Sequence, residues 1–387
     1  MKLAVPKEIW PGEKRVAVTP DTVKKLIGLG FDVAIEAGAG TDAAIPDDRF
    51  ADAGATIVKT MKATVKDADV ILKVRPPVVD GKTDELAAYK KGAAVIALLD
   101  PYDRKDLIEK MAAAGVSSFA MELMPRISRA QSMDVLSSQS NLAGYRSVID
   151  AAHEFGRIYP MMMTAAGTLP PARIVIVGAG VAGLQAIATA KRLGAVVSAF
   201  DVRPAVKEQV QSLGGTFIEV DEDDAADGET SGGYAKEMSD EYKAKQAAKL
   251  KDVLAKTDIV ITTALIPGRP APQIVTADMV AGMKPGSVII DLAAERGGNV
   301  AGAKLGETIV TANGVKIIGP ENITSSVATD ATAMYAKNLL NFITLSVDKD
   351  KGTLTFDPKD QIIAETMLTC DGKVVHPKFG GEEVANG

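Results

Sequence analysis

Three glycines in the middle of the chain have the spacing of a phosphate-binding turn. Gly178, Gly180 and Gly183 form the pattern G-x-G-x-x-G between the apolar run RIVIV and the alanine-rich run LQAIATA. This context predicts a buried strand, a tight turn and a helix. The first glycine allows the turn, the second lets the backbone approach a pyrophosphate, and the third lets helix and strand pack closely. The free N–H groups at the helix N-terminus favour the bound phosphates.

An acidic residue, Asp201, follows the next predicted strand, about 20 residues after the glycines. A carboxylate at this position accepts hydrogen bonds from the ribose hydroxyls of adenosine and repels a 2′-phosphate, so the pattern favours NAD(H) over NADP(H). Arg203 leaves the second conclusion open, because an arginine near this position accommodates a 2′-phosphate. The alternative to a dinucleotide site is a glycine-rich turn without a ligand.

The neighbouring backbone completes the predicted dinucleotide site. In an open parallel sheet the ligand lies over the carboxyl ends of the strands, which places the end of the run DIVITTALIP beside the cofactor. The ends of SVIIDLAAERGG, around Ala293 and Glu295, are expected nearby. The predicted cofactor-binding residues in this half of the chain are Gly178, Ala179, Gly180, Val181, Gly183, Asp201, Val202, Arg203, Gly233, Tyr234, Gln246, Ala264 and Leu265.

One loop of this predicted domain has an unusual composition. The run VDEDDAADGETSGGYAKEMSDEYKAKQ is acidic, rich in glycine and almost without aliphatic residues, so it cannot bury itself. A long loop between two strands is uncommon unless it is functional. Two interpretations remain open: a disordered surface insertion, or a lid hinged at Gly232 and Gly233 that brings Tyr234 over the cofactor.

Composition limits the classes of function. The 387 residues suffice for about two domains, and 47% of them are hydrophobic. The net charge of −6 argues against nucleic-acid binding, which needs a basic face. A single cysteine, Cys370, excludes an internal disulfide and a cysteine-based zinc site, so we predict no metal and a reducing compartment.

No segment has the features of a targeting or membrane-spanning sequence. The beginning MKLAVPKEIW lacks a signal-peptide pattern, and no apolar run reaches the roughly 18–20 residues that span a bilayer. We therefore expect a cytoplasmic chain that is not inserted in a membrane. Any association with a membrane is expected through a partner.

Apolar periodicity predicts alternating strands and helices in both halves of the chain. Helices are expected at residues 19–30, where Thr19 caps before Pro20, and at 103–115. This order predicts two mostly parallel sheets, each covered by helices on both faces. The expected strands are residues 3–6, 31–38, 68–75 and 93–100 in the first half and 172–178, 196–203, 216–220, 258–266 and 287–293 in the second.

Two long helices are expected to cross between the domains, near residues 138–162 and 323–345. The chain would then leave the first domain, build the second and return, so that the C-terminal tail completes the first. We predict an N-terminal Rossmann-like domain of residues 1–138 plus 328–387 and an NAD(H)-binding Rossmann domain of residues 139–327. The predicted fold is α/β, with two doubly wound parallel-sheet domains joined by long helices and the cofactor in the interdomain cleft.

Segments along essentially the whole chain resemble the alanine dehydrogenase and transhydrogenase superfamily. They are VPKEIWPGEKRVAVTPDTVKKLIGLGFDVAIEAGAG, DADVILKVRPP, the glycine pattern, IPGRPAP, DLAAERGGN and NLLNFI. Within this superfamily, PRISRAQSMDVLSSQSNLAGY is similar to the signature loop of the NAD(H)-binding (alpha-1, domain I) subunits of proton-translocating nicotinamide nucleotide transhydrogenases.

The resemblance assigns Arg126, Gln131 and Asp134, followed by Ser137, to this loop. It implies that these residues hold the nicotinamide and its ribose and serve hydride transfer. Their chemistry suits that role, because a carboxamide needs donors and acceptors and ribose hydroxyls suit a carboxylate. Arg129 is a competing candidate for the arginine position.

Amino-acid dehydrogenation is the main rival activity, and it needs a group that binds the substrate carboxylate and a group that transfers a proton. Arg15 and Lys73 match the substrate-binding arginine and lysine of alanine dehydrogenases. The histidine expected after the next strand is missing from AAVIALLDPYD, and Glu295 stands where that family has Asp. These departures favour structural roles for Arg15 and Lys73, such as pairing with Glu8 or Glu13.

The resemblance implies direct hydride transfer between NAD(H) on this chain and NADP(H) on a partner subunit, coupled to proton translocation by membrane subunits. Hydride exchange between two nicotinamides needs no side-chain acid or base, in keeping with the missing histidine. The implied partners are an NADP(H)-binding subunit, a membrane-spanning proton-channel subunit and a second copy in a homodimer. The alternatives are an NAD-dependent alanine or amino-acid dehydrogenase and a non-catalytic NAD-sensing subunit.

Overall fold

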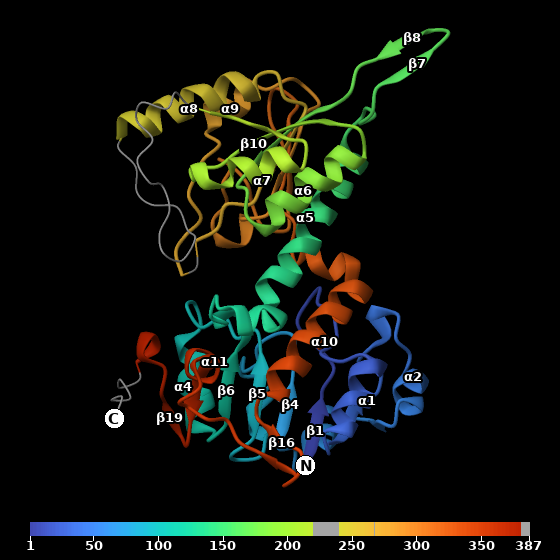
Figure 1. Ribbon diagram of the computed structural model, residues 1–387, viewed down its shortest axis with the longest axis vertical. Helices are drawn as coiled ribbons and strands as arrows, with labels where there is room; N and C mark the ends of the chain where they lie inside the picture. Colours follow the sequence, from blue (N-terminus) through green and yellow to red (C-terminus); the bar gives the residue numbers. More distant parts are fainter. Residues whose placement is uncertain (220–239, 267, 381–387) are drawn as a thin grey trace. The chain divides into compact units, whose positions relative to one another are not determined.

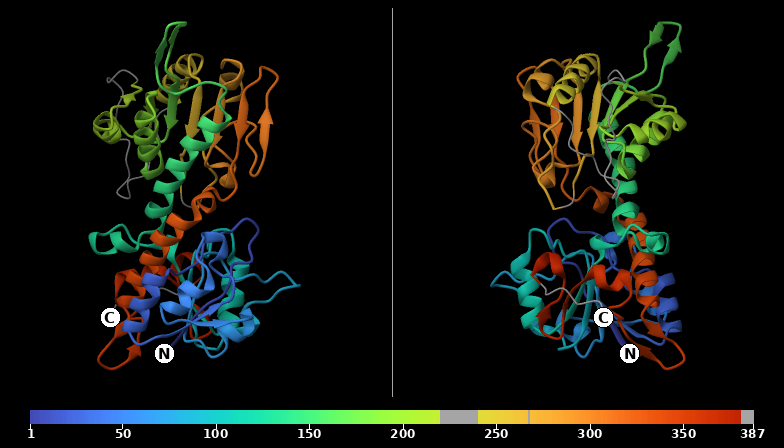
Figure 2. Two further views of the ribbon diagram at one scale, coloured as in Figure 1. Left: turned by 90° about the vertical axis from the view of Figure 1, so that its right-hand side faces the viewer. Right: turned by 60° about the vertical axis from the view of Figure 1, so that its left-hand side comes forward.

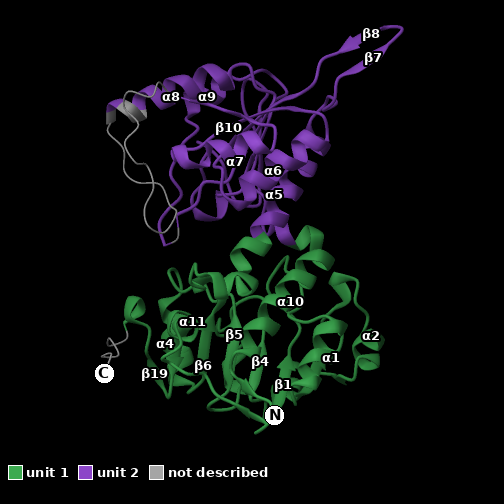
Figure 3. Cartoon of the chain, in the orientation of Figure 1, with its two compact units in different colours: residues 1–139, 325–387 green, residues 140–324 purple. Residues whose placement is uncertain are grey.

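The computed structural model describes residues 1–219, 240–266 and 268–380 of the chain. They form two compact units, which Figure 3 distinguishes by colour. Unit 1 contains residues 1–139 and the C-terminal segment from residue 325, and unit 2 contains residues 140–324. The expected hinge and lid at Gly232, Gly233 and Tyr234 lie outside the described residues.

Unit 1 is built on a sheet with the strand order β19-β18-β6-β5-β4-β1-β2-β3 (Figure 1). The strands are β1 (Lys2–Val5), β2 (Asp32–Glu36), β3 (Thr56–Val58), β4 (Val70–Leu72), β5 (Ala94–Ala97), β6 (Ser117–Ala120), β18 (Met367–Cys370) and β19 (Lys373–Val374). Strands β1 to β6 pair in parallel, and the C-terminal β18 joins β6 in antiparallel orientation. The chain winds outward from β1 on one side and from β4 on the other, so these strands flank the topological switch point.

Alternating side chains of the unit 1 strands enter two separate cores. In β1, Leu3 and Val5 pack into a core that also contains residues of α1 and α10, whereas Ala4 faces a core shared with α3 and α4. This alternation is the period-2 pattern of a sheet buried on both faces. The helices of this unit are α1 (Pro20–Gly28), α2 (Asp47–Asp52), α3 (Met61–Val65), α4 (Lys105–Ala113), α10 (Ala328–Thr344) and α11 (Gln361–Thr366). The predicted Thr19 cap before Pro20 is confirmed, because the Thr19 side chain accepts from the Thr22 N–H.

Unit 2 is built on a sheet with the strand order β11-β10-β9-β12-β13-β15-β14. All neighbouring pairs are parallel except β14 with β15. The strands are β9 (Arg173–Val177), β10 (Val196–Phe200), β11 (Thr216–Phe217), β12 (Ile259–Thr262), β13 (Val288–Asp291), β14 (Thr308–Val310) and β15 (Lys316–Ile318). The switch point lies between β9 and β12, where the predicted glycine turn follows β9.

Helices cover both faces of the unit 2 sheet. One core joins α6 and α7 to the strands, together with the second half of α5. The other core joins α8 and α9 to the opposite face. These helices are α5 (Val135–Glu154), α6 (Val181–Arg192), α7 (Lys207–Ser212), α8 (Asp240–Leu254) and α9 (Ala277–Ala281). The prediction of Rossmann-like α/β sheets is confirmed.

The helix expected at residues 138–162 is wrong in its last portion. Helix α5 ends at Glu154, and the chain then turns back, with Tyr159 donating its hydroxyl to the Val148 carbonyl at 3.1 Å. Pro160 cannot continue a helix because it lacks an N–H donor. The helix expected at 323–345 is a 3₁₀ segment, η8 (Ile323–Val327), followed by α10.

A hairpin projects from unit 2 after this turn (Figure 2). It consists of β7 (Met162–Thr164) and β8 (Gly167–Leu169), whose residues are all exposed. A second short hairpin, β16 (Val347–Asp348) with β17 (Thr353–Leu354), follows α10. The remaining 3₁₀ segments are η1 (Thr41–Ala43), η2 (Leu86–Ala88), η3 (Met121–Leu123), η4 (Ser128–Met133), η5 (Pro204–Val206), η7 (Ala294–Arg296) and η9 (Pro377–Phe379).

The close packing of α5 on α6 generates a prediction. A Cβ on Gly144 of α5 would lie 2.1 Å from the carbonyl oxygen of Ala182, in the first turn of α6. We expect Gly144→Ala to destabilise the protein by about 1–3 kcal/mol through overpacking, although alanine is the better helix former. Urea unfolding measures this change.

Gly156→Ala is the matched control, because a Cβ there meets nothing within 4 Å. Equal or greater stability of the Gly144→Ala protein would show that the two helices separate without cost.

Candidate nucleotide-binding site

The glycine turn of unit 2 leaves no room for side chains at two of its three glycines. Gly178 has a φ of +95°, and a Cβ there would lie 2.7 Å from the Thr263 hydroxyl oxygen. A Cβ on Gly183 would lie 1.8 Å from the Gly178 carbonyl oxygen. The first glycine therefore permits the turn, and the third permits the contact between α6 and the end of β9.

The middle glycine leaves open space beside the start of α6. Gly180 is the N-cap of this helix, and a Cβ built on it meets nothing within 4 Å. As a glycine it offers no side chain to cap the first N–H groups of α6, so these groups are available to an anion. A pyrophosphate fits the chemistry of this position. Val181, the first residue of α6, is exposed.

Asp201 is buried at the end of β10 and ties the turn together. Its Oδ2 accepts the Ala179 N–H at 2.7 Å, and its Oδ1 accepts the Arg203 N–H at 2.9 Å. The Arg203 side chain adds two hydrogen bonds, from Nε to Oδ1 and from Nη2 to Oδ2, both at 2.9 Å. These four bonds use the lone-pair positions of the carboxylate. A ribose hydroxyl can therefore bind Asp201 only if the Arg203 side chain moves away.

The ends of β12 and β13 meet the glycine turn through polar contacts. The Thr263 hydroxyl donates to the Gly178 carbonyl at 3.0 Å. The buried Asn299 side chain accepts from the Ala264 N–H at 2.9 Å and donates to the Ala264 carbonyl at 2.8 Å. The expected neighbourhood of Ala264 and the glycine turn is thus present. Leu265 has an exposed side chain.

A buried carboxylate, Asp291, organises the loop after β13. Its Oδ1 accepts the Thr262 hydroxyl at 2.8 Å, and its Oδ2 accepts the N–H groups of Asn299 and Val300 at 2.8 and 3.0 Å. Burial raises the pKa of Asp291, against the effect of these hydrogen bonds. Sequence reasoning missed Asp291 and Asn299, although the acid directly follows a strongly apolar strand.

Other predicted site residues of unit 2 have different surroundings. Val202 packs on the core that contains α8 and α9. Gln246 is buried in α8, on the sheet face opposite to α6. Gly233 and Tyr234 lie outside the described residues.

The predicted signature loop lies in unit 1, between η3 and α5. Gln131 and Arg126 are exposed. Asp134 directly precedes α5, and its carboxylate accepts the Ser137 N–H at 2.9 Å and the Ser137 hydroxyl at 2.5 Å. Arg129 makes a bidentate pair with Asp360, with both distances 2.7 Å. The two candidate arginines therefore differ, since Arg129 binds a carboxylate of its own chain through both guanidinium NH₂ groups.

Buried charges fill the switch point of unit 1. Lys73, directly after β4, is fully buried and contacts Glu8 at 3.3 Å and Glu85 at 3.0 Å. Burial opposes the charge of this ammonium group, yet the two carboxylates raise the pKa of Lys73 above its ordinary value. The predicted pairing of Lys73 with Glu8 is confirmed.

The second buried cation of unit 1 is also paired. Arg15 donates to Glu13 through Nε at 2.8 Å and Nη2 at 2.7 Å, and to Gln139 through Nη1 at 2.9 Å. Burial opposes ionisation of Glu13, but Arg15 and Arg75 hold the pKa of Glu13 at about 2. The predicted pairing of Arg15 with Glu13 is confirmed, and both charges stay in place at neutral pH.

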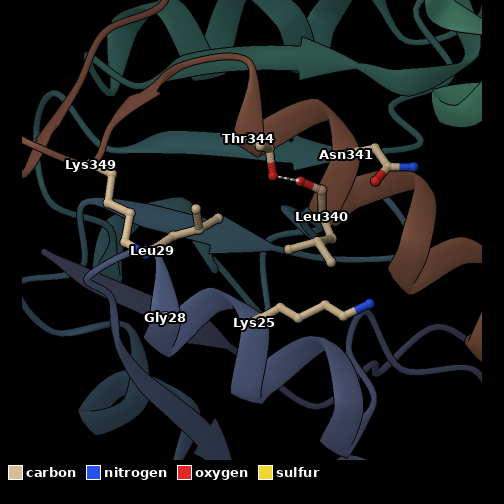
Figure 4. Close-up of a pocket in the computed structure, with 7 residues that line it drawn as sticks. All are labelled: Lys25, Gly28, Leu29, Leu340, Asn341, Thr344 and Lys349. Atoms are coloured by element: carbon tan, nitrogen blue, oxygen red, sulfur yellow. Dashed lines mark hydrogen bonds between the residues drawn. The ribbon is translucent and has the colours of Figure 1, made fainter.

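A surface pocket of about 390 Å³ in unit 1 lies apart from these charges (Figure 4). It is open and is lined by side chains of α1 and α10 together with Lys349. Among the described helices, none is long and apolar enough to cross a membrane.

Comparison with known proteins supports a common family for both units. The alanine dehydrogenase/PNT N-terminal domain matches residues 4–143, and the alanine dehydrogenase/PNT C-terminal domain matches residues 147–377. The chain is 57% identical over 383 residues to an NAD(P) transhydrogenase subunit alpha chain of Rhodospirillum rubrum, covering 99% of this chain and 100% of that protein.

Two solved structures have the same two-domain Rossmann-like architecture. A transhydrogenase from Sinorhizobium meliloti superposes with a TM-score of 0.88 at 53% identity and covers 97% of this chain and 100% of its own. An L-alanine dehydrogenase superposes with a TM-score of 0.80 at 25% identity and covers 98% of both chains.

The bonding of Asp201 generates a prediction about nucleotide choice. We expect Asp201→Asn to weaken NADH binding about tenfold, roughly 1.4 kcal/mol, because it disrupts the turn and removes the ribose acceptor. Discrimination against NADPH should fall, since Arg203 loses its partner. Titration calorimetry with both nucleotides measures these changes.

Asp278→Asn serves as the control, because Asp278 is exposed on α9 and pairs with Lys251. Unchanged affinities of the Asp201→Asn protein for both nucleotides would remove Asp201 from the ribose-binding site.

Proposed function

Because this chain belongs to the alanine dehydrogenase/PNT family, we propose that it is the NAD(H)-binding component of a proton-translocating NAD(P) transhydrogenase. In this proposal, NAD(H) on the chain exchanges a hydride directly with NADP(H) on a partner subunit. Membrane subunits couple the exchange to proton translocation. The relatives named NAD(P) transhydrogenase subunit alpha support this assignment, since that name implies a multi-subunit assembly.

The paired state of Arg15 and Lys73 carries the choice between transhydrogenation and amino-acid dehydrogenation. A substrate carboxylate would need at least one of these cations, yet each is buried and paired with glutamates of the same unit. A further carboxylate there would be an additional buried charge without a counter-ion, which is strongly unfavourable. Unit 1 therefore supports an activity that uses no amino-acid substrate.

Direct hydride exchange makes few demands on side-chain chemistry. Neither reacting carbon gains or loses a proton, so no general acid or base is required. The protein orients the two rings and excludes water. We assign contacts with the nicotinamide and its ribose to the exposed Arg126 and Gln131 and to Asp134 and Ser137. The pairing of Arg129 with Asp360 supports Arg126 over Arg129 in this role.

The phosphates and the adenosine belong in unit 2 in this proposal. The glycine turn and the N-terminus of α6 would hold the pyrophosphate. Asp201 would hold the ribose after displacement of Arg203. The preference for NAD(H) over NADP(H) rests on this carboxylate.

We assign a second copy of the chain as a partner in a homodimer. The projecting hairpin exposes large apolar side chains, which are Met161, Met162, Met163 and Leu169. Clustered apolar side chains on a projecting element are typical of protein interfaces.

Reconstitution of the complex tests the proposed function. The chain is mixed with membranes that carry the partner subunits of Rhodospirillum rubrum, and NADPH-dependent reduction of an NAD⁺ analogue is followed by absorbance. We expect activity in the mixture alone, rising to saturation as the chain is added.

Alanine with NAD⁺ is tested in parallel with the chain alone. NAD⁺ reduction in that assay, without transhydrogenation in the mixture, would favour the dehydrogenase. NADH binding without either activity would favour the non-catalytic NAD-sensing subunit.

Gln131 provides a separate test of the signature loop. We expect Gln131→Ala to slow hydride transfer about tenfold or more while changing the NADH dissociation constant much less, because misplacement of a reacting ring costs rate more than binding. Single-turnover kinetics and NADH fluorescence titration measure the two effects.

Ser128→Ala, at an exposed position of the same loop, is the control. Loss of NADH affinity with an unchanged transfer rate would make Gln131 a binding residue without a role in alignment.

A further inference from the structure

The exposed Gln131 lies on a loop segment that is fixed to unit 1 on both sides. Ala130 and Met133 of η4 are buried in the core, and Asp134 bonds to Ser137 at the start of α5. The segment therefore presents Gln131 from a supported backbone. The contacts that support it come from α10 and from the start of α11, two elements that sequence analysis did not connect with this loop.

The first support is the ion pair between Arg129 and Asp360. Its two parallel hydrogen bonds, each 2.7 Å long, define both the distance and the orientation of the guanidinium group. Arg129 lowers the pKa of Asp360, so this carboxylate is ionised at neutral pH. Asp360 is itself held in place, because its Oδ1 accepts the Ile362 N–H at 2.9 Å and caps α11. Ile362 is fully buried, which ties the pair to the core.

The second support acts on the residue after Gln131. The Ser132 carbonyl accepts hydrogen bonds from Asn338 Nδ2 at 2.9 Å and from Asn341 Nδ2 at 3.0 Å. These two donors from α10 use both lone pairs of the carbonyl oxygen. Asn338 is oriented in turn by the Ser138 hydroxyl, which donates to its Oδ1 at 2.7 Å. Asn341 also borders the open pocket on α10, where Figure 4 labels it.

These contacts lie on either side of the proposed nicotinamide-contacting residue. We propose that Arg129, Asp360, Asn338 and Asn341 are positioning residues, which hold the loop so that Gln131 and Asp134 meet the nicotinamide end of NAD(H) in a single geometry. This inference rests on the proposed function, because it assigns these residues to the same site. They act through the loop backbone and touch no reacting atom. Functional residues held by such supporting contacts gain precision of placement, on which transfer rates depend steeply.

A purely structural role would give a different result from positioning. An exposed ion pair contributes little to global stability, so loss of the Arg129–Asp360 pair should leave the thermal midpoint almost unchanged. Loop placement should suffer nonetheless, because a short 3₁₀ segment has few internal hydrogen bonds. The expected signature is a lower rate of hydride transfer at an unchanged melting temperature.

The test uses the full chain with the variants Arg129→Gln, Asp360→Asn, their combination, and Asn341→Ala. Asp360→Asn keeps an oxygen that can cap α11. We expect each variant to slow single-turnover hydride transfer about tenfold, with NADH affinity within about threefold. The double variant should be no slower than either single variant of the pair. Backbone amides of residues 128–134 should exchange hydrogen for deuterium faster.

Lys110→Gln is the matched control, since it removes an exposed ion pair with Asp106 on α4 of the same unit. Wild-type transfer rates and wild-type amide exchange in the variants would overturn the inference. A rate loss that tracks a lower melting temperature would overturn it as well, because it would indicate a structural role.

Failure of the proposed function has a different signature. In that case the wild-type chain itself shows no transfer with partner membranes. The exchange measurement still reports whether the four residues hold the loop. If wild-type transfer is present and the variants are unaffected, the positioning role alone fails.

Discussion

Helix α6 approaches the end of β9 so closely that a single methyl group between them would overlap with the backbone. A Cβ on Gly183 would lie 1.8 Å from the Gly178 carbonyl oxygen, and the same carbonyl accepts the Thr263 hydroxyl from the neighbouring strand end. This contact brings the start of α6 to the switch point of the sheet. The Asp201 bond to the Ala179 N–H then holds the turn in the conformation that exposes the helix N-terminus. The nucleotide-binding character of unit 2 follows from this packing.

Unit 1 has a closely related α/β architecture, yet its switch point has the opposite character. In unit 2 the strand ends leave N–H groups available for an anion. In unit 1 the corresponding crevice is filled by Lys73 with Glu8 and Glu85. Charges buried in this way are tolerated only because each has partners of opposite sign. The two units thus divide the work: one offers a dinucleotide site, and the other presents a supported loop at the end of its own core.

Much of the fold was predictable, because it depends on local patterns. Short β-branched runs and helical periodicity predicted two parallel sheets with helices on both faces, and this prediction is confirmed. The error at residues 155–162 came from extending an amphipathic pattern past Gly156 to Pro160, where the chain turns back and Tyr159 bonds to α5. The turn depends on a contact that sequence periodicity does not encode.

By itself, the sequence determined the glycine turn, the acid after β10 and the loop that carries Gln131, because these features have fixed spacing along the chain. Tertiary structure decided what those groups contact. Only the folded chain pairs Asp201 with Arg203 through both oxygens, and only there do Asp360 and Asn338 reach a loop more than 200 residues away in sequence. The physical reason is that hydrogen bonds and ion pairs depend on distance in space, and packing of the core brings together side chains whose separation in sequence carries no signal.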